Sequence, residues 1–359
     1  MTKPRWCLLI RVARVAFLLA LAACAPMRPA AATTQTVQQP ARTSLPERLS
    51  SADFWTLVSD ISEPGGYFRI IDNFTSNERE IGRLFTMLRE QGVSGGVYLG
   101  VGPEQNLTYI AAIRPVMAFI VDIRRQAVVQ HLMFKAIFEL SNDRADFISM
   151  LFSKARPQAL NASTPIRTIW DAYWPVPSDS AMAVKNYALI VDHLTRKHRF
   201  TLNAEESAQL LSVFNAFYWF GPTISTRGQP GGRGGGNSVT FADLTAYAAD
   251  DAGQPQSFLS TEENYAYVKA LHEKNLIVPV SGDFGGPKAI RAIGAYLRDR
   301  GGVVSAFYVS NVEQYLFQDG KARLFYDNVA TLPVTEKSVF IRPYSLRRLG
   351  VNEALACVR

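Results

Sequence analysis

The clearest pattern of apolar and polar positions lies between residues 97 and 122, where two short apolar runs enclose a glycine-containing turn. The first run, residues 97–99, is rich in strand-forming side chains, and the second, residues 117–121, ends on Asp122. Short apolar runs bounded by turn residues are typical of buried strands. The pattern therefore predicts a strand, a turn, a helix and a second strand that ends in an acid, the first half of a nucleotide-binding βαβ unit.

The turn contains Gly100 and Gly102, followed by Pro103 and Glu104. Proline fits the first turn of a helix and a carboxylate is stabilised near its positive end, so we expect a helix to begin here. If the unit binds a nucleotide, the glycines let the backbone approach the ligand and Asp122 binds the ribose hydroxyls. In the alternative interpretation, the glycines only turn the chain and Asp122 caps the next helix.

The residues after the glycines favour some ligands over others. A dinucleotide fingerprint has a third small residue where this chain has Gln105. The carboxylate of Glu104 is also expected where a pyrophosphate would dock on the helix, and like charges would repel each other there. We therefore expect an adenosine-like ligand with a cationic or zwitterionic tail, such as S-adenosylmethionine, rather than NAD or FAD.

Further strands are predicted at residues 239–241, 276–280 and 303–309, and each is followed by a polar side chain. The carboxyl ends of parallel strands meet at one edge of a sheet, which is where α/β folds bind their ligands. The side chains expected at this edge are Asp122, Asp243, Asp283 and Asn311.

The remaining segments complete an α/β fold. Residues 322–326 and 338–341 predict an antiparallel pair that closes a mostly parallel, Rossmann-like sheet. We place this α/β domain at residues 91–345, with a helical insertion at about 141–237 that ends in a glycine-rich loop. The segment before it, residues 51–90, is predicted to be an N-terminal extension.

The four histidines lie in helical stretches that are rich in charged residues, so we expect them to be solvated. His131 lies off the apolar stripe of a helix predicted at residues 126–140. His193 and His198 are five residues apart, a poor spacing for two ligands on one helical face. The fourth is His272. The sequence therefore predicts no metal site.

The start of the chain has the pattern of a secretory signal. Four of the 38 Lys and Arg residues, and none of the 31 Asp and Glu residues, lie in residues 1–23, where an apolar run ends at Leu-Ala-Ala before Cys24. A basic region, a short apolar core and small residues before a cleavage site are typical of such signals. The other 34 basic and 31 acidic residues leave a net charge of only +3, so we expect no nucleic-acid surface.

Leu-Ala-Ala-Cys also resembles the bacterial lipobox, which implies cleavage before Cys24 and acylation of its thiol. Ala25 in the next position implies sorting to the outer membrane, so we expect a lipid-anchored envelope protein that faces the periplasm. An ordinary cleaved signal or a retained leader is the alternative. Residues 24–50 are predicted to be a disordered tether and residues 346–359 a tail.

Several blocks along the chain, among them VYLGVGPEQN, AFIVDIRR and VPVSGDFGGPKAIRAIG, resemble an uncharacterised bacterial family labelled methyltransferase-like. The predicted topology resembles that of the class I S-adenosylmethionine-dependent methyltransferases. This resemblance implies that Gly100 and Gly102 face the methionine part of the cofactor, Asp122 its ribose and Asp243 its adenine. It also implies a catalytic or substrate-orienting position for Asp283.

Two functions remain open. In the first, the protein is a methyltransferase or a diverged enzyme, with Asp283 as acid or base, assisted by Glu313 or Tyr308, and with Glu104 helping Asp122 to hold the ligand. In that position Asp283 is equally suited to cap the helix that follows. In the second, the cleft binds a nucleoside-like metabolite, another small ligand or a partner without catalysis. We favour the second, because an exported protein would lie where S-adenosylmethionine is not supplied.

Overall fold

The computed structural model describes residues 44–69, 72–79, 81–227 and 239–349. The predicted leader, Cys24, most of the predicted tether, nearly all of the glycine-rich loop and most of the tail lie outside these residues. Within them, no helix combines the length and the apolar composition that crossing a membrane requires.

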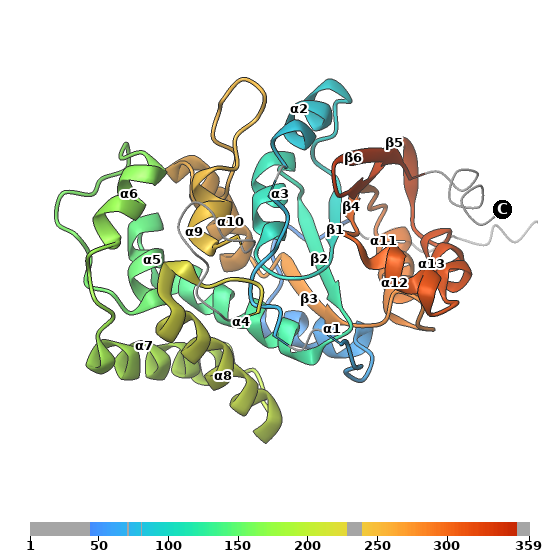
Figure 1. The fold of residues 1–359 in the computed structure, drawn as a ribbon. Coiled ribbons are helices and arrows are strands. Elements are labelled where there is room, and N and C mark those ends of the chain that lie inside the picture. The colour runs from blue at the N-terminus through green and yellow to red at the C-terminus, as the bar shows by residue number, and fades with distance from the viewer. Residues whose placement is uncertain (1–43, 70–71, 80, 228–238, 350–359) are drawn as a thin grey trace, which may run out of the picture. The chain divides into compact units, whose positions relative to one another are not determined.

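The described residues form a six-stranded sheet with the strand order β3-β2-β1-β4-β5-β6 (Figure 1). Strands β1 to β5 are parallel, and β6 runs antiparallel to β5. The predicted α/β class, with a mostly parallel sheet and a closing antiparallel pair, is confirmed. The strands are β1 (Val97–Gly100), β2 (Met117–Asp122), β3 (Ile277–Ser281), β4 (Val304–Tyr308), β5 (Val334–Arg342) and β6 (Ser345–Arg348).

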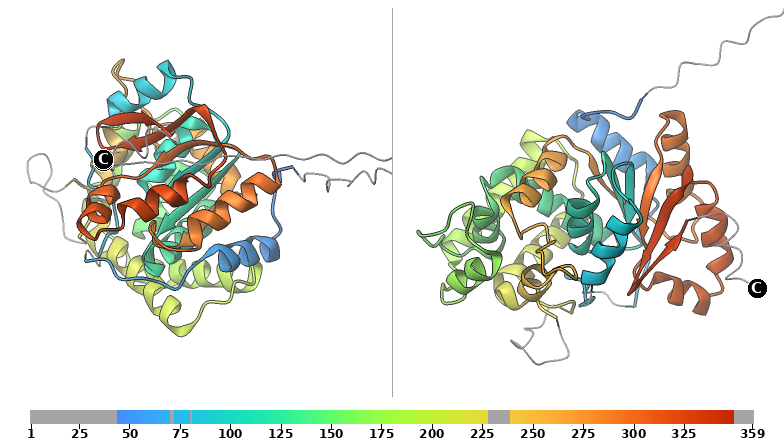
Figure 2. Two further views of the ribbon diagram at one scale, coloured as in Figure 1. Left: turned by 90° about the vertical axis from the view of Figure 1, so that its right-hand side faces the viewer. Right: turned by 90° about the horizontal axis from the view of Figure 1, so that it is seen from above.

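Helices cover both faces of the sheet, which explains why the central strands are apolar on both sides. Every residue of β1, β2 and β3 is buried, as expected for parallel strands between helical layers. In Figures 1 and 2, α3 (Gln105–Ile113), α4 (Arg125–Leu140) and α10 (Glu262–Glu273) lie on one side of the sheet, and α11 (Ala289–Asp299) and α13 (Ala322–Val329) lie on the other.

The other helices extend these layers. α1 (Ser51–Ile61) contacts β3 and α11, and α2 (Gly82–Glu90) contacts β6. α12 (Val312–Gln318) follows β4. Between β2 and β3 the chain forms a group of helices that pack on one another and on α4 (Figure 1). These are α5 (Arg144–Phe152), α6 (Ile166–Tyr173), α7 (Ser180–Asp192), α8 (Ala204–Phe220) and α9 (Phe241–Ala246).

Two predicted strands are wrong. Residues 239–241 form only an isolated bridge between Ser225 and Thr240, after which α9 begins. Thr240 accepts a hydrogen bond from the backbone N–H of Asp243 at 3.0 Å, and the Asp243 side chain bonds back to Thr240. This capping box starts a helix where a three-residue apolar run suggested a strand.

The second wrong strand is residues 322–326, which form most of α13. The buried apolar residues of this helix, Ala322, Phe325, Tyr326 and Val329, recur at spacings of three and four, the period of a helix that packs one face. The antiparallel pair is instead β5 with β6, in register from Val339 opposite Arg348 to Arg342 opposite Ser345.

The expectation that the histidines are solvated is also wrong. His131 and His272 are 2% and 1% exposed, and His193 and His198 are 6% and 7% exposed. For His131 the reason is the packing of α4, which lies between the sheet and the helices α5, α7 and α8 and has twelve of its sixteen residues buried. A helix that is packed on both sides has no solvated face on which a polar side chain would remain exposed.

Candidate functional site

A cleft of about 380 Å³ opens at the carboxyl ends of the parallel strands. Its lining includes Gly102 after β1, Asp122 at the end of β2, Asp283 after β3 and Tyr308 at the end of β4. The chain runs outward from β1 to β2 and β3 on one side, and from β4 to β5 on the other. The cleft therefore includes the boundary between β1 and β4, the switch point at which open α/β sheets bind ligands.

Asp122 lies in the cleft together with Arg124, which sequence reasoning missed. Oδ1 of Asp122 accepts hydrogen bonds from the backbone N–H and Nε of Arg124, at 2.9 and 3.1 Å, and Oδ2 accepts one from Nη2 at 2.9 Å. The side chains are 7% and 8% exposed. A carboxylate has about four acceptor positions, so Oδ2 keeps one for a ligand hydroxyl.

Asp283 is the second acid of the cleft, and it too is paired. Its Oδ2 lies 2.7 Å from Nζ of Lys321, and its Oδ1 accepts a hydrogen bond from the backbone N–H of Gly285. Asp283 therefore does not cap α11. Asp319 and Arg69 also line the cleft, so the described residues of its lining include three acids and three bases. This balance favours a ligand with no large net charge.

The two glycines of the turn have different surroundings. Gly102 has a φ of +79°, and a Cβ built there would meet no atom within 4 Å. A Cβ at Gly100 would lie 1.9 Å from Oδ1 of Asn106 and 2.8 Å from the Tyr98 ring. Gly102 leaves the cleft open, whereas Gly100 makes room for the packing of the turn itself.

Asn106 holds the turn in place from within α3. Its Nδ2 donates to the carbonyl groups of Val101, Gly102 and Pro103 at 2.9, 3.0 and 2.7 Å, and its Oδ1 accepts from the hydroxyl of Tyr98 at 3.0 Å. Asn106 is completely buried. The turn beside the cleft is therefore held in place by a buried side chain of the protein itself.

Glu104 is not among the described residues that line the cleft, and it is 1% exposed. Its carboxyl oxygens accept hydrogen bonds from the backbone N–H of Ser76 at 3.1 and 3.2 Å, and the carboxyl also bonds its own backbone N–H. Burial raises the pKa of Glu104 from 4.5 to about 8, against the opposing effect of these hydrogen bonds. Among the described residues at the start of α3, the carboxyl group therefore bonds only the N–H of Glu104 itself, and its other backbone donor, Ser76, lies before the sheet.

The other predicted site residues lie elsewhere. Asp243 belongs to the capping box of α9. Glu313 bonds Nε and Nη2 of Arg342 and the hydroxyl of Tyr326. Neither is among the described residues that line the cleft. Asn311, by contrast, lines the cleft beside Tyr308, so three of the four predicted strand-end side chains come together.

The cleft also has an aromatic wall, which the sequence pattern did not reveal. Phe68 and Tyr315 meet edge to face at 5.0 Å between ring centroids, and the guanidinium of Arg69 lies 4.4 Å from the centre of the Tyr315 ring. Phe68 precedes the sheet and Tyr315 belongs to α12. The signal available in the sequence was Tyr67-Phe68-Arg69, an aromatic pair and a base outside any periodic face.

The chain matches the model of a family described as a domain of unknown function, DUF7790, over residues 73–209 and 239–356. The match covers more than half of the chain, so the protein belongs to this family. The matched ranges contain the strand ends that line the cleft. No curated protein matches the chain.

Proposed function

We propose that the cleft binds an uncharged or zwitterionic nucleoside-like molecule, on a fold related to the class I methyltransferases. The observation that carries the proposal is the position of Asp122 and Gly102 together at the switch point of the sheet. The five parallel strands and the antiparallel strand at the edge support the relationship to that fold.

The ribose of such a ligand would bind at Asp122. The acceptor position left on Oδ2 takes one hydroxyl, while Arg124 holds the carboxylate in place. Phe68 and Tyr315 provide aromatic surface against which a base would stack, a contact worth about 1–3 kcal/mol in nucleic-acid complexes. Gly102 gives the tail of the ligand room to pass close to the backbone.

Two helix N-termini at this edge of the sheet are already occupied by carboxyl groups of the chain, which argues against a phosphorylated ligand. At the start of α3, the carboxyl group of Glu104 is buried and bonds its own backbone N–H. At the start of α11, Oε1 of Glu63 accepts hydrogen bonds from the backbone N–H groups of Lys288 and Ala289 at 2.8 and 2.9 Å. Free N–H groups at a helix N-terminus are the usual anchor of a phosphate.

Calorimetry with adenosine, S-adenosylhomocysteine and ATP tests the proposal. We expect micromolar binding of the first two, no gain from the phosphates of ATP, and about tenfold weaker binding in Asp122→Asn, since one hydrogen bond to a charged group is worth roughly 1.5 kcal/mol or more. Asp243→Asn lies outside the cleft lining and is the matched control. If none of these molecules binds, or if Asp122→Asn binds as tightly as the wild type, the proposal fails.

Methyl transfer from S-adenosylmethionine is the second candidate, and the presence of both Asp283 and Tyr308 in the cleft lining favours it. One assay distinguishes a methyltransferase from a binding protein. Transfer of a labelled methyl group to an added acceptor, lost in Asp283→Asn, supports the enzyme. Binding of S-adenosylmethionine and S-adenosylhomocysteine without turnover supports the binding protein.

We further propose that the mature protein is exported and anchored in the outer membrane through a lipid on Cys24. The basic region, the apolar run and Leu-Ala-Ala-Cys in residues 1–24 support this. Labelling with radioactive palmitate should be lost in Cys24→Ala. Unchanged labelling, or full-length protein recovered without processing, would contradict it.

A further inference from the structure

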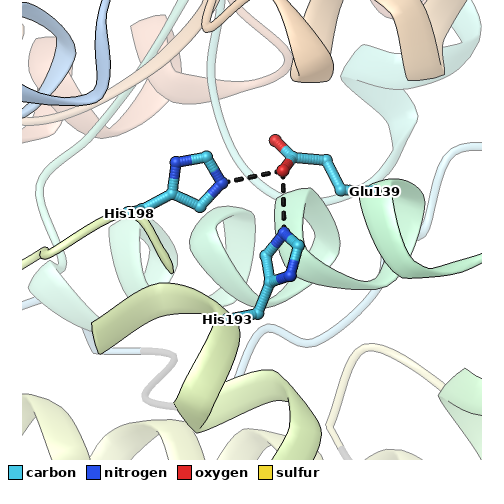
Figure 3. Close-up of side chains that lie close together, drawn as sticks. All are labelled: Glu139, His193 and His198. Carbon is cyan, nitrogen blue, oxygen red and sulfur yellow. Dashed lines mark hydrogen bonds and ion pairs between the residues drawn. The ribbon is translucent and has the colours of Figure 1, made fainter. Parts of the chain in front are cut away.

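Two histidines and a glutamate meet in a buried cluster away from the cleft (Figure 3). Nε2 of His193 and Nε2 of His198 each lie 2.7 Å from Oε2 of Glu139. The three side chains are 6%, 7% and 4% exposed. Glu139 comes from the last turn of α4, and the histidines follow α7.

A π-helical turn brings the two histidines together. Residues His193–Lys197 form this turn, and the backbone N–H of His198 donates to the carbonyl of His193 at 3.1 Å. The bond spans five residues, so side chains five apart lie on the same face, which an α-helix does not allow. The spacing that argued against a shared site in the sequence therefore produces one in the structure.

Neighbouring side chains hold the imidazole of His198 in place. Ser51, the first residue of α1, forms a hydrogen bond of 2.8 Å between its Oγ and Nδ1 of His198. Phe200 stacks on the same ring at 5.0 Å between centroids. Hydrogen bonding of the second ring nitrogen is how proteins orient metal-binding histidines.

The cluster contains more nitrogen atoms than the carboxylate oxygen can accept. Nζ of Lys197 lies 3.4 Å from Oε2 of Glu139 and 3.4 Å from Nε2 of His193. Together with the two imidazoles, three nitrogen atoms approach one oxygen that has two lone pairs. The other oxygen, Oε1, already accepts a hydrogen bond from Nζ of the buried Lys135 at 2.5 Å.

From this geometry we propose that Glu139, His193 and His198 bind one divalent transition-metal ion of the zinc type. Two imidazoles and one carboxylate are a known zinc ligand set that leaves a fourth position open. An ion between the three side chains takes up lone pairs of both Nε2 atoms and of Oε2. Lys197, whose side chain is 60% exposed, moves into solvent and leaves the fourth position to water.

The proposed ion links helices to one another and lies away from the cleft. Arg125, the first residue of α4, follows Arg124 of the cleft lining. Glu139 lies 14 residues further along α4, which is roughly 21 Å at the rise of an α-helix. Through its ligands and Ser51, the ion joins the end of α4, the end of α7 and the start of α1. This inference does not depend on the proposed ligand of the cleft.

The test is calorimetric titration of the full-length protein, produced without a histidine tag and stripped with a chelator, with Zn²⁺. We expect one ion per chain, and at least about 100-fold weaker binding in His193→Gln and in His198→Gln, since loss of even an outer hydrogen-bond partner costs 10–100-fold. Co²⁺ should give the visible absorption of a tetrahedral site in the wild type and lose it in both variants. His272→Gln removes a buried histidine outside the cluster and is the matched control.

Lys197→Gln keeps the test decisive if the histidine variants fail to fold. Because this substitution removes an exposed ammonium group that competes with the ion, we expect Zn²⁺ to bind more tightly and to raise Tm further than in the wild type. If the three side chains form only hydrogen bonds and ion pairs, we expect no Zn²⁺ binding in the wild type or in any variant. Absence of saturable binding in both the wild type and Lys197→Gln, or binding that survives loss of either histidine, overturns the proposal.

Discussion

The stability of the turn beside the cleft should depend on pH through Glu104. Its folded-state pKa of about 8 lies above the usual 4.5 because the carboxyl group is buried. Between these two values the folded protein holds a proton that the unfolded chain releases. The contribution of Glu104 to stability is therefore fully present below about pH 4.5 and is lost as the pH rises through 8.

The size of this effect follows from the shift in pKa. A change from 4.5 to about 8 corresponds to about 5 kcal/mol at 1.36 kcal/mol per unit. Glu104→Gln removes the titration and keeps one carbonyl oxygen for the backbone N–H of Ser76. We expect the variant to be about 1 kcal/mol less stable at pH 5, because one hydrogen bond is lost, and several kcal/mol more stable than the wild type at pH 9.

Urea denaturation of both proteins at each unit from pH 5 to pH 9 measures the difference. His131→Gln is a control of opposite sign, since burial lowers the pKa of His131 from 6.5 to about 4 while its Nε2 bonds the carbonyl of Gly102. The contribution of His131 to the stability of the wild type is present above pH 6.5 and is lost as the pH falls through about 4. If the difference between wild type and Glu104→Gln does not change with pH, Glu104 ionises normally and the reasoning is refuted.

The remaining predictions concern backbone space and a buried charge. Gly100→Ala should destabilise the fold by about 3 kcal/mol because its Cβ would overlap Asn106, whereas Gly102→Ala should cost only about 1 kcal/mol and weaken adenosine binding. Equal effects of the two substitutions in urea denaturation would contradict this distinction. Arg144→Met should destabilise by about 3–5 kcal/mol, because Arg144 is 1% exposed and pairs with Glu262 at 2.9 Å. A loss below 1 kcal/mol would show that the Arg144 pair contributes little.

The part of the fold that the sequence predicted well is the part with strong local signals. β1 and β2 follow from continuous apolar runs, and the cleft follows from the polar residues after them. The prediction failed where a segment was too short for its apolar residues to distinguish the period of a strand from that of a helix. In α13, the short run around Phe325 and Tyr326 predicts a strand, whereas a longer window that includes Ala322 and Val329 shows a helical stripe.

The site was predicted less completely. The sequence pattern shows the acids at the strand ends, but it does not show the basic side chains that pair with them in the fold. Asp122 and Asp283 were found, but Arg124 and Lys321, which neutralise them, were not. Lys321 lies 38 residues after Asp283, so only the folded chain brings them together. Glu104, which the sequence places where a phosphate would dock, is buried and not among the described residues that line the cleft, and its carboxyl group bonds the backbone N–H groups of Ser76 and of Glu104 itself.

The histidines show most clearly where local reasoning stops. A polar side chain on a helix is expected to face water, but α4 has protein on both sides, so His131 is buried there. The rule that ligands recur at three or four residues holds only for an α-helix, and one extra residue in the turn after α7 replaces it with a spacing of five. The extra residue interrupts the regular α-helical hydrogen bonding after α7. In exchange, His193 and His198 lie on one face and both reach the same carboxylate, which is why we propose a metal ion there.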